Sequence, residues 1–226
     1  MKNKVVLFGK EIDNISKLVK EKGFVVVHEN PDFVVSYGGD GTVMQSEEKY
    51  PGIPKIILRN SRICKLCSPF ENSEVLEKVS DGEYITLDYW KLVVEAKHQT
   101  LLALNEIIVH NHDARHAIRY KLIVNDRQIG HEVIGDGVVV ATPFGSTGYY
   151  RSITDSFFEV GIGLAFNNST ERSDHMILKE DAKIELEITR GPAVVFADNQ
   201  NGQIELNIGD KVTITKSLNF AHIIKV

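Results

Sequence analysis

The sequence of 226 residues lacks several features that would mark a membrane, secreted or nucleic-acid-binding protein. No apolar run is long enough to span a bilayer, and the N-terminal stretch MKNKVVLFGKEIDN has no signal-peptide apolar core. The formal net charge is -5 and no long basic block offsets it, which argues against a nucleic-acid partner. We therefore expect a protein with neither a membrane nor a nucleic-acid partner.

Cysteine is also scarce. The two cysteines, Cys64 and Cys67, form a lone C-x-x-C motif without the second pair that a zinc ribbon needs. The motif does not follow the βαβ context of thioredoxin-like proteins, so we expect no redox role. With no export signal, this low cysteine count favours a reducing, cytoplasmic location.

The first third of the chain alternates between two kinds of segment. Short apolar runs rich in β-branched residues predict strands, and amphipathic stretches between them predict helices. The predicted strands are residues 4–9, 24–29, 32–37 and 54–60, and the predicted helices are residues 11–23 and 68–82. Ser68, ahead of Pro69, is the expected N-cap of the second helix. Such alternation indicates a mostly parallel α/β sheet.

From about residue 85 the pattern changes to short apolar segments separated by polar turns, beginning with YWKLVVEA and ending with KVTITK. This pattern is typical of antiparallel β structure. We therefore predict an α/β N-terminal domain, residues 1–84, followed by a mainly antiparallel, β-sandwich-like C-terminal domain, residues 85–226.

The stretch DFVVSYGGDGTVM ends a predicted strand in a turn that contains Gly38, Gly39, Asp40, Gly41 and Thr42. Without Cβ atoms, such a turn can bring backbone N–H groups close to phosphate oxygens, and Thr42 can add a hydroxyl or cap the following helix. Asp40 could then bind the metal that accompanies a nucleotide, or accept a proton from an attacking hydroxyl. The alternative is an ordinary turn, because Gly and Asp dominate turns.

Two later stretches carry further polar groups. LLALNEIIVHN places Asn105 and Glu106 in an apolar strand, where an amide suits a purine edge and a carboxylate suits ribose hydroxyls. GDGVVVATPFGSTGYY places small residues and hydroxyls at a strand-to-helix turn, with Tyr149 available for ring stacking. Taken singly, the first could be a strand end or a bulge, and the second a capped turn.

Together the three stretches resemble the NAD kinase family in order and spacing. GGDGT alone is similar to the phosphate loop shared by NAD kinases, diacylglycerol and sphingosine kinases and, more distantly, phosphofructokinases. The Asn-Glu strand and the DGV…TP.GST.Y segment favour the NAD kinases. LAFNN resembles the family's loop ending in Asn-Asn, and FADNQ resembles its Asp-Gly-Gln turn.

The resemblance implies transfer of the terminal phosphoryl group of ATP, or of polyphosphate, to the 2'-hydroxyl of the adenosine ribose of NAD, giving NADP. It implies Mg²⁺ or another divalent cation, to which we assign no ligand, and a homodimer or homotetramer in which Asp136 can reach across a subunit interface. Asp40 is the implied catalytic residue. The implied NAD- and phosphate-binding residues are Gly38, Gly39, Gly41, Thr42, Asn105, Glu106, Asp136, Thr147, Gly148, Tyr149 and Ser152.

Several positions depart from the family pattern. After PKI the family has a glycine-rich segment, but here the chain reads ILRNSRICKLC, in which Asn60 is kept and the glycines are not. Phe144 stands where the family has threonine, and Gly148 where it has alanine. Two alternatives therefore remain: a dinucleotide-binding protein with an impaired phosphate-donor site, and a lipid kinase of the same superfamily.

Overall fold

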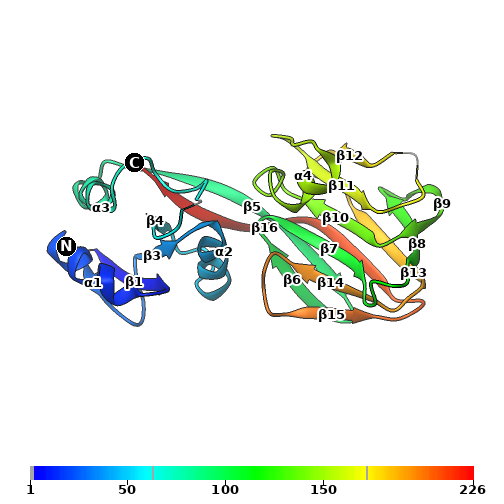
Figure 1. Cartoon of the computed structure of the whole chain (residues 1–226), viewed down its shortest axis with the longest axis horizontal. Coiled ribbons are helices and arrows are strands. Elements are labelled where there is room, and N and C mark those ends of the chain that lie inside the picture. Colours follow the sequence, from blue (N-terminus) through cyan, green and yellow to red (C-terminus); the bar gives the residue numbers. More distant parts are fainter. Residues whose placement is uncertain (1–2, 63, 172) are drawn as a thin grey trace. The chain divides into compact units, whose positions relative to one another are not determined.

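The computed structural model describes residues 3–62, 64–171 and 173–226, and the chain divides into two compact units (Figure 1). Unit 1 comprises Met1–Tyr89 and Asn219–Val226, and unit 2 comprises Trp90–Leu218. Two long strands, β5 (Ile85–Ala96) and β16 (Lys211–Lys225), run through the points of division. The expected boundary between residues 84 and 85 falls inside unit 1. Nothing in the sequence indicated that residues 219–226 also belong to this unit.

Unit 1 is built on a parallel sheet with the strand order β2-β1-β3-β4-β16. Its other elements are β1 (Lys4–Gly9), α1 (Ile12–Glu21), β2 (Val25–Val26), β3 (Phe33–Gly38), α2 (Asp40–Lys49), β4 (Lys55–Arg59) and α3 (Asn72–Asp81). The C-terminal strand joins this sheet because Ile223 pairs with Lys55 in parallel register. The sequence had indicated the parallel α/β pattern but not this last strand.

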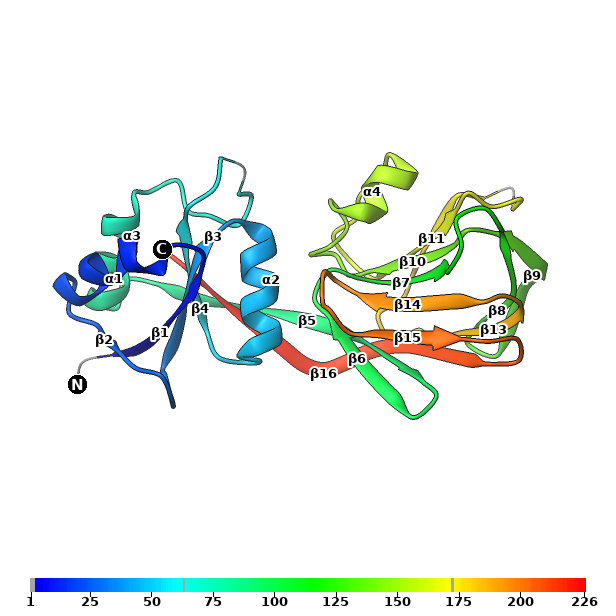
Figure 2. The same cartoon turned by 60° about the horizontal axis from the view of Figure 1, so that its bottom comes forward.

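Helices cover both faces of the sheet in unit 1, as Figure 2 shows. On one face, Ile15 of α1 and Leu76 of α3 pack into a core with Val35 and Leu58. On the other face, Val43 of α2 packs in a second cluster with Ile57 and Ile223. Strands buried on both faces are continuously apolar rather than alternating, which is why the runs in this third of the chain stood out in the sequence.

Unit 2 contains a six-stranded antiparallel sheet with the order β12-β11-β10-β7-β14-β15. A second group of antiparallel strands lies opposite it, with β13 paired to β8 and β16, β8 to β9, and β5 to β6. The elements are β6 (Gln99–Ala103), β7 (Glu106–Asn111), β8 (Ile118–Val124), β9 (Arg127–Gly135), β10 (Gly137–Ala141), α4 (Tyr149–Thr154), β11 (Ile162–Asn167), β12 (His175–Leu178), β13 (Ile184–Arg190), β14 (Ala193–Ala197) and β15 (Gln203–Leu206). The predicted fold class, α/β followed by antiparallel β, is confirmed.

Alternation along the strands of unit 2 separates a core face from an outer face. Ile107 of β7 and Val138 of β10 point into the core between the two groups of strands. Val139 of β10 faces the other way and packs against Tyr150 of α4. Adjacent strand residues face opposite sides, so Glu106 lies on the same outer face as α4. This outer face is where the polar residues singled out in the sequence can reach a ligand.

One local expectation was wrong. Ser68 does not cap the helix at residues 68–82, because α3 begins only at Asn72 and its N-cap position is held by Glu71. The Ser68 hydroxyl instead accepts a hydrogen bond from the N–H of Phe70 at 3.3 Å, in a local turn of the kind that serine side chains favour.

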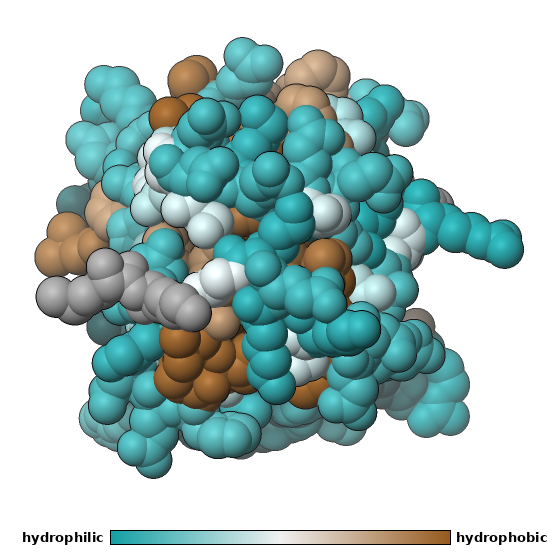
Figure 3. All heavy atoms as spheres, turned by 90° about the vertical axis from the view of Figure 1, so that its left-hand side faces the viewer, coloured by the Kyte–Doolittle hydropathy of each residue, from teal (hydrophilic) through white to brown (hydrophobic). Residues whose placement is uncertain are grey.

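The helices in the described parts of the chain are too short or too polar to cross a membrane. The face of the molecule in Figure 3 is mostly hydrophilic, with hydrophobic residues in separate small patches.

Candidate functional site

In unit 1, Asp40 lies at the junction between β3 and α2. The strand ends at Gly38, Gly39 takes the N-cap position, and the helix begins at Asp40 itself. A carboxylate in the first turn of a helix is favoured by the positive end of the helix dipole. The junction therefore presents a charged group at the carboxyl end of a parallel strand, where open α/β sheets bind their ligands.

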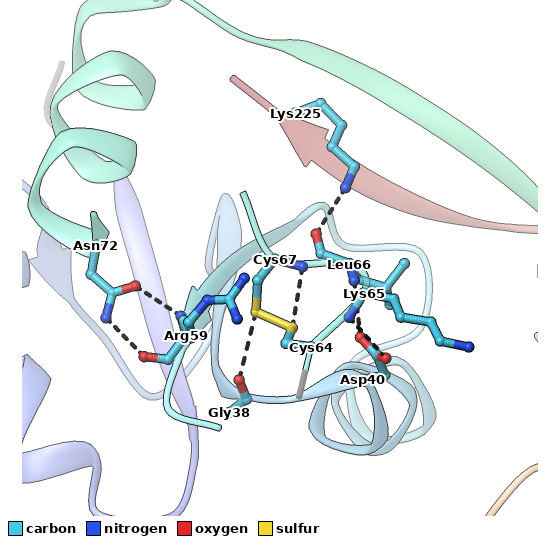
Figure 4. Close-up of a disulfide and its surroundings, with 9 residues drawn as sticks. All are labelled: Gly38, Asp40, Arg59, Cys64, Lys65, Leu66, Cys67, Asn72 and Lys225. Carbon is cyan, nitrogen blue, oxygen red and sulfur yellow. Dashed lines mark hydrogen bonds between the residues drawn. A yellow bond between two sulfur atoms is a disulfide. The ribbon is translucent and has the colours of Figure 1, made fainter. Parts of the chain in front are cut away.

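The carboxylate of Asp40 is held by the backbone of a distant loop, as Figure 4 shows. Its Oδ2 accepts the N–H of Lys65 at 3.1 Å, and its Oδ1 accepts the N–H of Leu66 at 3.0 Å. Each carboxylate oxygen has two acceptor sites, and the described residues fill one on each through these two bonds. The two bonds therefore fix the orientation of the Asp40 carboxylate without using all of its hydrogen-bond acceptor capacity.

The glycine turn is needed for packing. A Cβ atom built on Gly38 would lie 2.2 Å from Oγ1 of Thr42, far inside contact distance. The absence of a side chain at Gly38 lets the first turn of α2 fold back against the strand. Thr42 does not cap the helix, as the sequence had allowed, because the helix starts two residues before it. Gly39 holds the N-cap position, and Gly41 follows Asp40 in the first turn of the helix.

The two cysteines are joined. A disulfide links Cys64 and Cys67, closing the loop whose two central N–H groups hold Asp40. A bonded pair was not expected from the sequence, where the low cysteine count favoured a reducing location. The motif lies in a connection between β4 and α3, and the turn between the cysteines brings their side chains within bonding reach.

In unit 2, a carboxylate that sequence reasoning did not single out organises the Asn105–Glu106 stretch. Asp198 accepts three consecutive backbone N–H groups, those of Leu104 at 2.8 Å, Asn105 at 2.8 Å and Glu106 at 3.0 Å. The side chain is partly buried, and the loss of solvent raises the pKa of Asp198 while the N–H donors oppose the increase. The only signal in the sequence was that FADNQ resembles a turn of the family.

The segment that contains GST also contacts the backbone of Leu104 and Asn105. The Thr142 hydroxyl donates to the carbonyl oxygen of Leu104 at 2.6 Å and accepts the N–H of Gly145 at 3.1 Å. The N–H of Thr142 donates to the carbonyl oxygen of Asn105 at 2.8 Å. A Cβ atom on Gly145 would lie 2.3 Å from that oxygen, so only glycine permits this approach. Three stretches far apart in sequence thus meet at the bend before β7.

Two side-chain oxygens at this bend are buried without a hydrogen-bond partner among the described residues: Oδ1 of Asn105 and Oε2 of Glu106. Burial, with a smaller contribution from the Asp198 carboxylate, raises the pKa of Glu106 to about 8. Near neutral pH the Glu106 side chain is therefore mainly a protonated carboxyl that can both donate and accept. Buried polar atoms without partners are costly, so these two oxygens are available to pair with a ligand or a water molecule.

The remaining predicted residues lie on the same unit. A Cβ atom at Gly148 would lie 3.5 Å from Oε2 of Glu106, so the start of α4 adjoins that carboxyl. Thr147 is exposed beside it. The Tyr149 hydroxyl accepts the side-chain N–H of Asn167 at 3.0 Å, and the Ser152 hydroxyl bonds back to the Tyr149 carbonyl oxygen at 2.6 Å.

Asp136 belongs to a neighbouring network. Its two oxygens accept the side-chain amides of Asn111 at 3.1 Å and Asn168 at 3.0 Å. Asn167 and Asn168, the two asparagines of LAFNN, were noted in the sequence only as an echo of a family loop. In the structure they orient Tyr149 and Asp136 respectively.

No group of three or more His, Cys, Asp or Glu side chains suited to a metal ion occurs in the described ranges. Magnesium in phosphoryl-transfer sites is often bound by one or two carboxylates together with substrate phosphates. Asp40, partly exposed and with acceptor sites left over, fits that kind of binding.

Comparison with known protein families and sequences gives a consistent result. Residues 104–226 match the model of the ATP-NAD kinase C-terminal domain. The chain is 30% identical to NAD kinase 2, chloroplastic, of Arabidopsis thaliana over 95% of its own length but only 25% of that protein. It is 30% identical to the NAD kinase of Caldanaerobacter subterraneus subsp. tengcongensis, over 88% of this chain and 75% of that one.

Two solved structures share the fold over the whole chain. Yeast NADH kinase complexed with NADH superposes with a TM-score of 0.86 at 16% identity, covering 84% of that chain. An NAD kinase from Archaeoglobus fulgidus in complex with ATP superposes with a TM-score of 0.80 at 25% identity, covering 94% of that chain.

Proposed function

The chain belongs to the NAD kinase family, and we propose that it transfers the terminal phosphoryl group of ATP to the 2'-hydroxyl of the adenosine ribose of NAD, giving NADP. The observation that carries this proposal is the bend before β7. There, three separate motifs meet around two buried oxygens of Asn105 and Glu106 that lack protein partners in the described structure.

Unit 2 is the proposed dinucleotide-binding part. The Asn105 amide pairs with the adenine edge, and the protonated Glu106 carboxyl bonds ribose hydroxyls, because each group can donate and accept. Thr147 and Gly148 line the site, and the ring of Tyr149 offers a stacking face. We propose that Asp136 and Ser152 provide further polar groups around the bound dinucleotide.

Unit 1 supplies the proposed chemical group. The Asp40 carboxylate accepts the proton of the ribose 2'-hydroxyl while that oxygen forms a bond to the terminal phosphorus and the bond to the ADP oxygen breaks. The neighbouring turn of Gly38, Gly39, Gly41 and Thr42 allows close phosphate approach. Phosphoryl transfer depends mainly on alignment and charge neutralisation, so a firmly oriented carboxylate suits it.

A divalent cation such as Mg²⁺, carried into the site on the substrate phosphates, would neutralise the phosphate charge. We propose ATP as the donor because a family member of the same fold binds it. Polyphosphate as an alternative donor, a homodimer or homotetramer, and a cytoplasmic location stay predictions from the sequence.

The proposal is tested by measuring NADP formation from NAD, ATP and Mg²⁺, beside NAD binding by calorimetry. Wild type is expected to turn over. Asp40→Asn is expected to lose turnover but to leave NAD binding largely intact, because Asn keeps the shape of Asp and removes only the charge that accepts the proton. Glu47→Gln is a poor control because Glu47 is buried, so exposed Glu48→Gln on the same helix serves instead.

The results distinguish an active NAD kinase from a dinucleotide-binding protein that lacks turnover. Wild-type rates in Asp40→Asn would refute the role of Asp40. NAD binding without turnover with ATP or polyphosphate would instead favour a dinucleotide-binding protein with an impaired donor site, consistent with the missing glycines near Asn60.

A further inference from the structure

The loop between β4 and α3 contains an arrangement that the proposed reaction does not by itself require. The two N–H groups that hold Asp40 belong to Lys65 and Leu66, which are the two residues enclosed by the Cys64–Cys67 disulfide. A covalent bond therefore closes the turn whose only inner residues contact the carboxylate (Figure 4).

We propose that the Cys64–Cys67 disulfide is a positioning device for Asp40, and that its reduction by a dithiol slows phosphoryl transfer. The proposal rests on the catalytic role proposed above for Asp40. It assigns a use to a motif whose position in the chain is that of a glycine-rich segment in the family pattern.

The disulfide anchors the turn at both ends. Cys64 is buried in the cluster of Val43 and Ile57, so its side chain ties the loop to the α2 face of the sheet. Sγ of Cys67 lies 3.8 Å from the carbonyl oxygen of Gly38, which places the other end against the glycine turn. The bond between the two sulfurs thus connects the core to the turn that presents Asp40.

The turn has other contacts besides the disulfide, since Leu66 and Cys67 pack against the cluster that contains Val43 and Ile57. The carbonyl oxygen of Leu66 accepts a hydrogen bond from Nζ of Lys225 at 2.8 Å, and the N–H of Cys67 donates to Sγ of Cys64 at 3.1 Å. The side chain of Lys65 is exposed, and the turn lies in no helix or strand. Without the disulfide, its backbone has many more conformations available, and most of them remove the N–H groups from Asp40.

The bond is placed where a reductant can reach it. Cys67 is only partly buried, whereas Cys64 is buried, so a thiolate of a dithiol attacks Sγ of Cys67 and releases the Cys64 thiolate. The second thiol of the reductant then displaces Cys67. The S–S bond of the protein is replaced by two thiols, and the dithiol leaves as a disulfide carrying the two-electron oxidation. Disulfides in reducing compartments are commonly transient and sensing, which agrees with this use.

The test compares the oxidised and the reduced full-length protein. The chain has only two cysteines, so thiol titration after denaturation reports its redox state directly. Dithiothreitol is the reductant, and diamide restores the oxidised form. We expect reduction to lower kcat for NADP formation by about tenfold or more, because a small misplacement of a catalytic group is costly.

Two further measurements distinguish positioning from general loosening. The affinity for NAD is expected to stay within about twofold, since a transition-state effect changes kcat rather than binding. Backbone amide exchange at Lys65 and Leu66 is expected to be slow in the oxidised protein and fast in the reduced protein. The double variant Cys64→Ala/Cys67→Ala should have the kcat and the exchange rates of the reduced wild type, and dithiothreitol should change neither.

The outcomes are separable. Equal kcat in the two redox states, or a lower kcat without faster exchange at Lys65 and Leu66, would overturn the inference while leaving the proposed function intact. If neither state forms NADP, the proposed function fails. The exchange rates still decide whether the disulfide holds the loop on Asp40: unchanged exchange on reduction overturns that part, and faster exchange supports it.

Discussion

The buried carboxyl of Glu106 should make unit 2 less stable as the pH rises. Its pKa in the folded protein is about 8, against 4.5 for an ordinary glutamate, mainly because of burial. Between these two values the folded protein holds a proton that the unfolded chain has lost. The contribution to stability is therefore fully present below pH 4.5 and is lost as the pH rises toward 8.

The size of the effect follows from this displacement of the pKa. At about 1.36 kcal/mol for each pH unit, the whole displacement corresponds to about 5 kcal/mol. Integration of the proton linkage places about 2 kcal/mol of this between about pH 6 and pH 8. Glu106→Gln keeps the shape and the hydrogen-bonding capacity but cannot ionise, so it should be spared this loss.

Urea unfolding at the two pH values measures the difference. The single tryptophan, Trp90, packs against the core of unit 2, so its fluorescence reports that unit. We expect wild type to lose about 2 kcal/mol more than Glu106→Gln between the two conditions. Exposed Glu95→Gln, also on unit 2, should behave like wild type. Identical pH dependence in wild type and Glu106→Gln would refute the assignment of a protonated Glu106.

Two substitutions test the backbone clamp at the bend before β7. Asp198→Ala removes the acceptor of three partly buried backbone N–H groups, so we expect about 3 kcal/mol or more of lost stability in urea unfolding, together with weaker NAD binding. Unchanged NAD affinity in a folded Asp198→Ala protein would contradict its positioning role. Gly145→Ala should cost about 2 kcal/mol or more because its Cβ would meet the Asn105 backbone at 2.3 Å. At Gly148 a Cβ atom would lie 3.1 Å from the carbonyl oxygen of Gly145, which is tight but longer than the 2.3 Å approach at Gly145, so Gly148→Ala should cost less than Gly145→Ala. Equal costs for the two variants would show that the close approach at Gly145 is relaxed.

Local patterns explain which parts of the fold were predictable. Apolar residues recur at helical spacing in residues 11–23, and the structure buries two of them, Ile15 and Val19, on one face of α1. The change near residue 85 to short alternating segments indicated antiparallel structure, which is what unit 2 contains. The start of α3 was predicted wrongly because a serine before a proline is typical both of a helix N-terminus and of a local turn. Here Ser68 accepts the N–H of Phe70 in a turn, and the helix begins later, at Asn72.

The candidate site divides in the same way. Residue types alone identified the chemical groups: a carboxylate among glycines at Asp40, an amide and a carboxyl at Asn105 and Glu106, and the segment that leads to Tyr149. They did so because a ligand needs particular donors and acceptors, and these are carried by residue type. Their order along the chain was enough to indicate the family.

The contacts that hold those groups in place depend on the folded chain and could not be predicted from local sequence. Asp198 lies more than ninety residues from the N–H groups that it accepts, and nothing local in FADNQ reveals that partnership. Likewise, the bonded Cys64–Cys67 pair and its hold on Asp40 depend on a loop that folds back over α2. Contacts of this kind are set by the packing of the whole unit, because residues distant in sequence become neighbours only when the core forms.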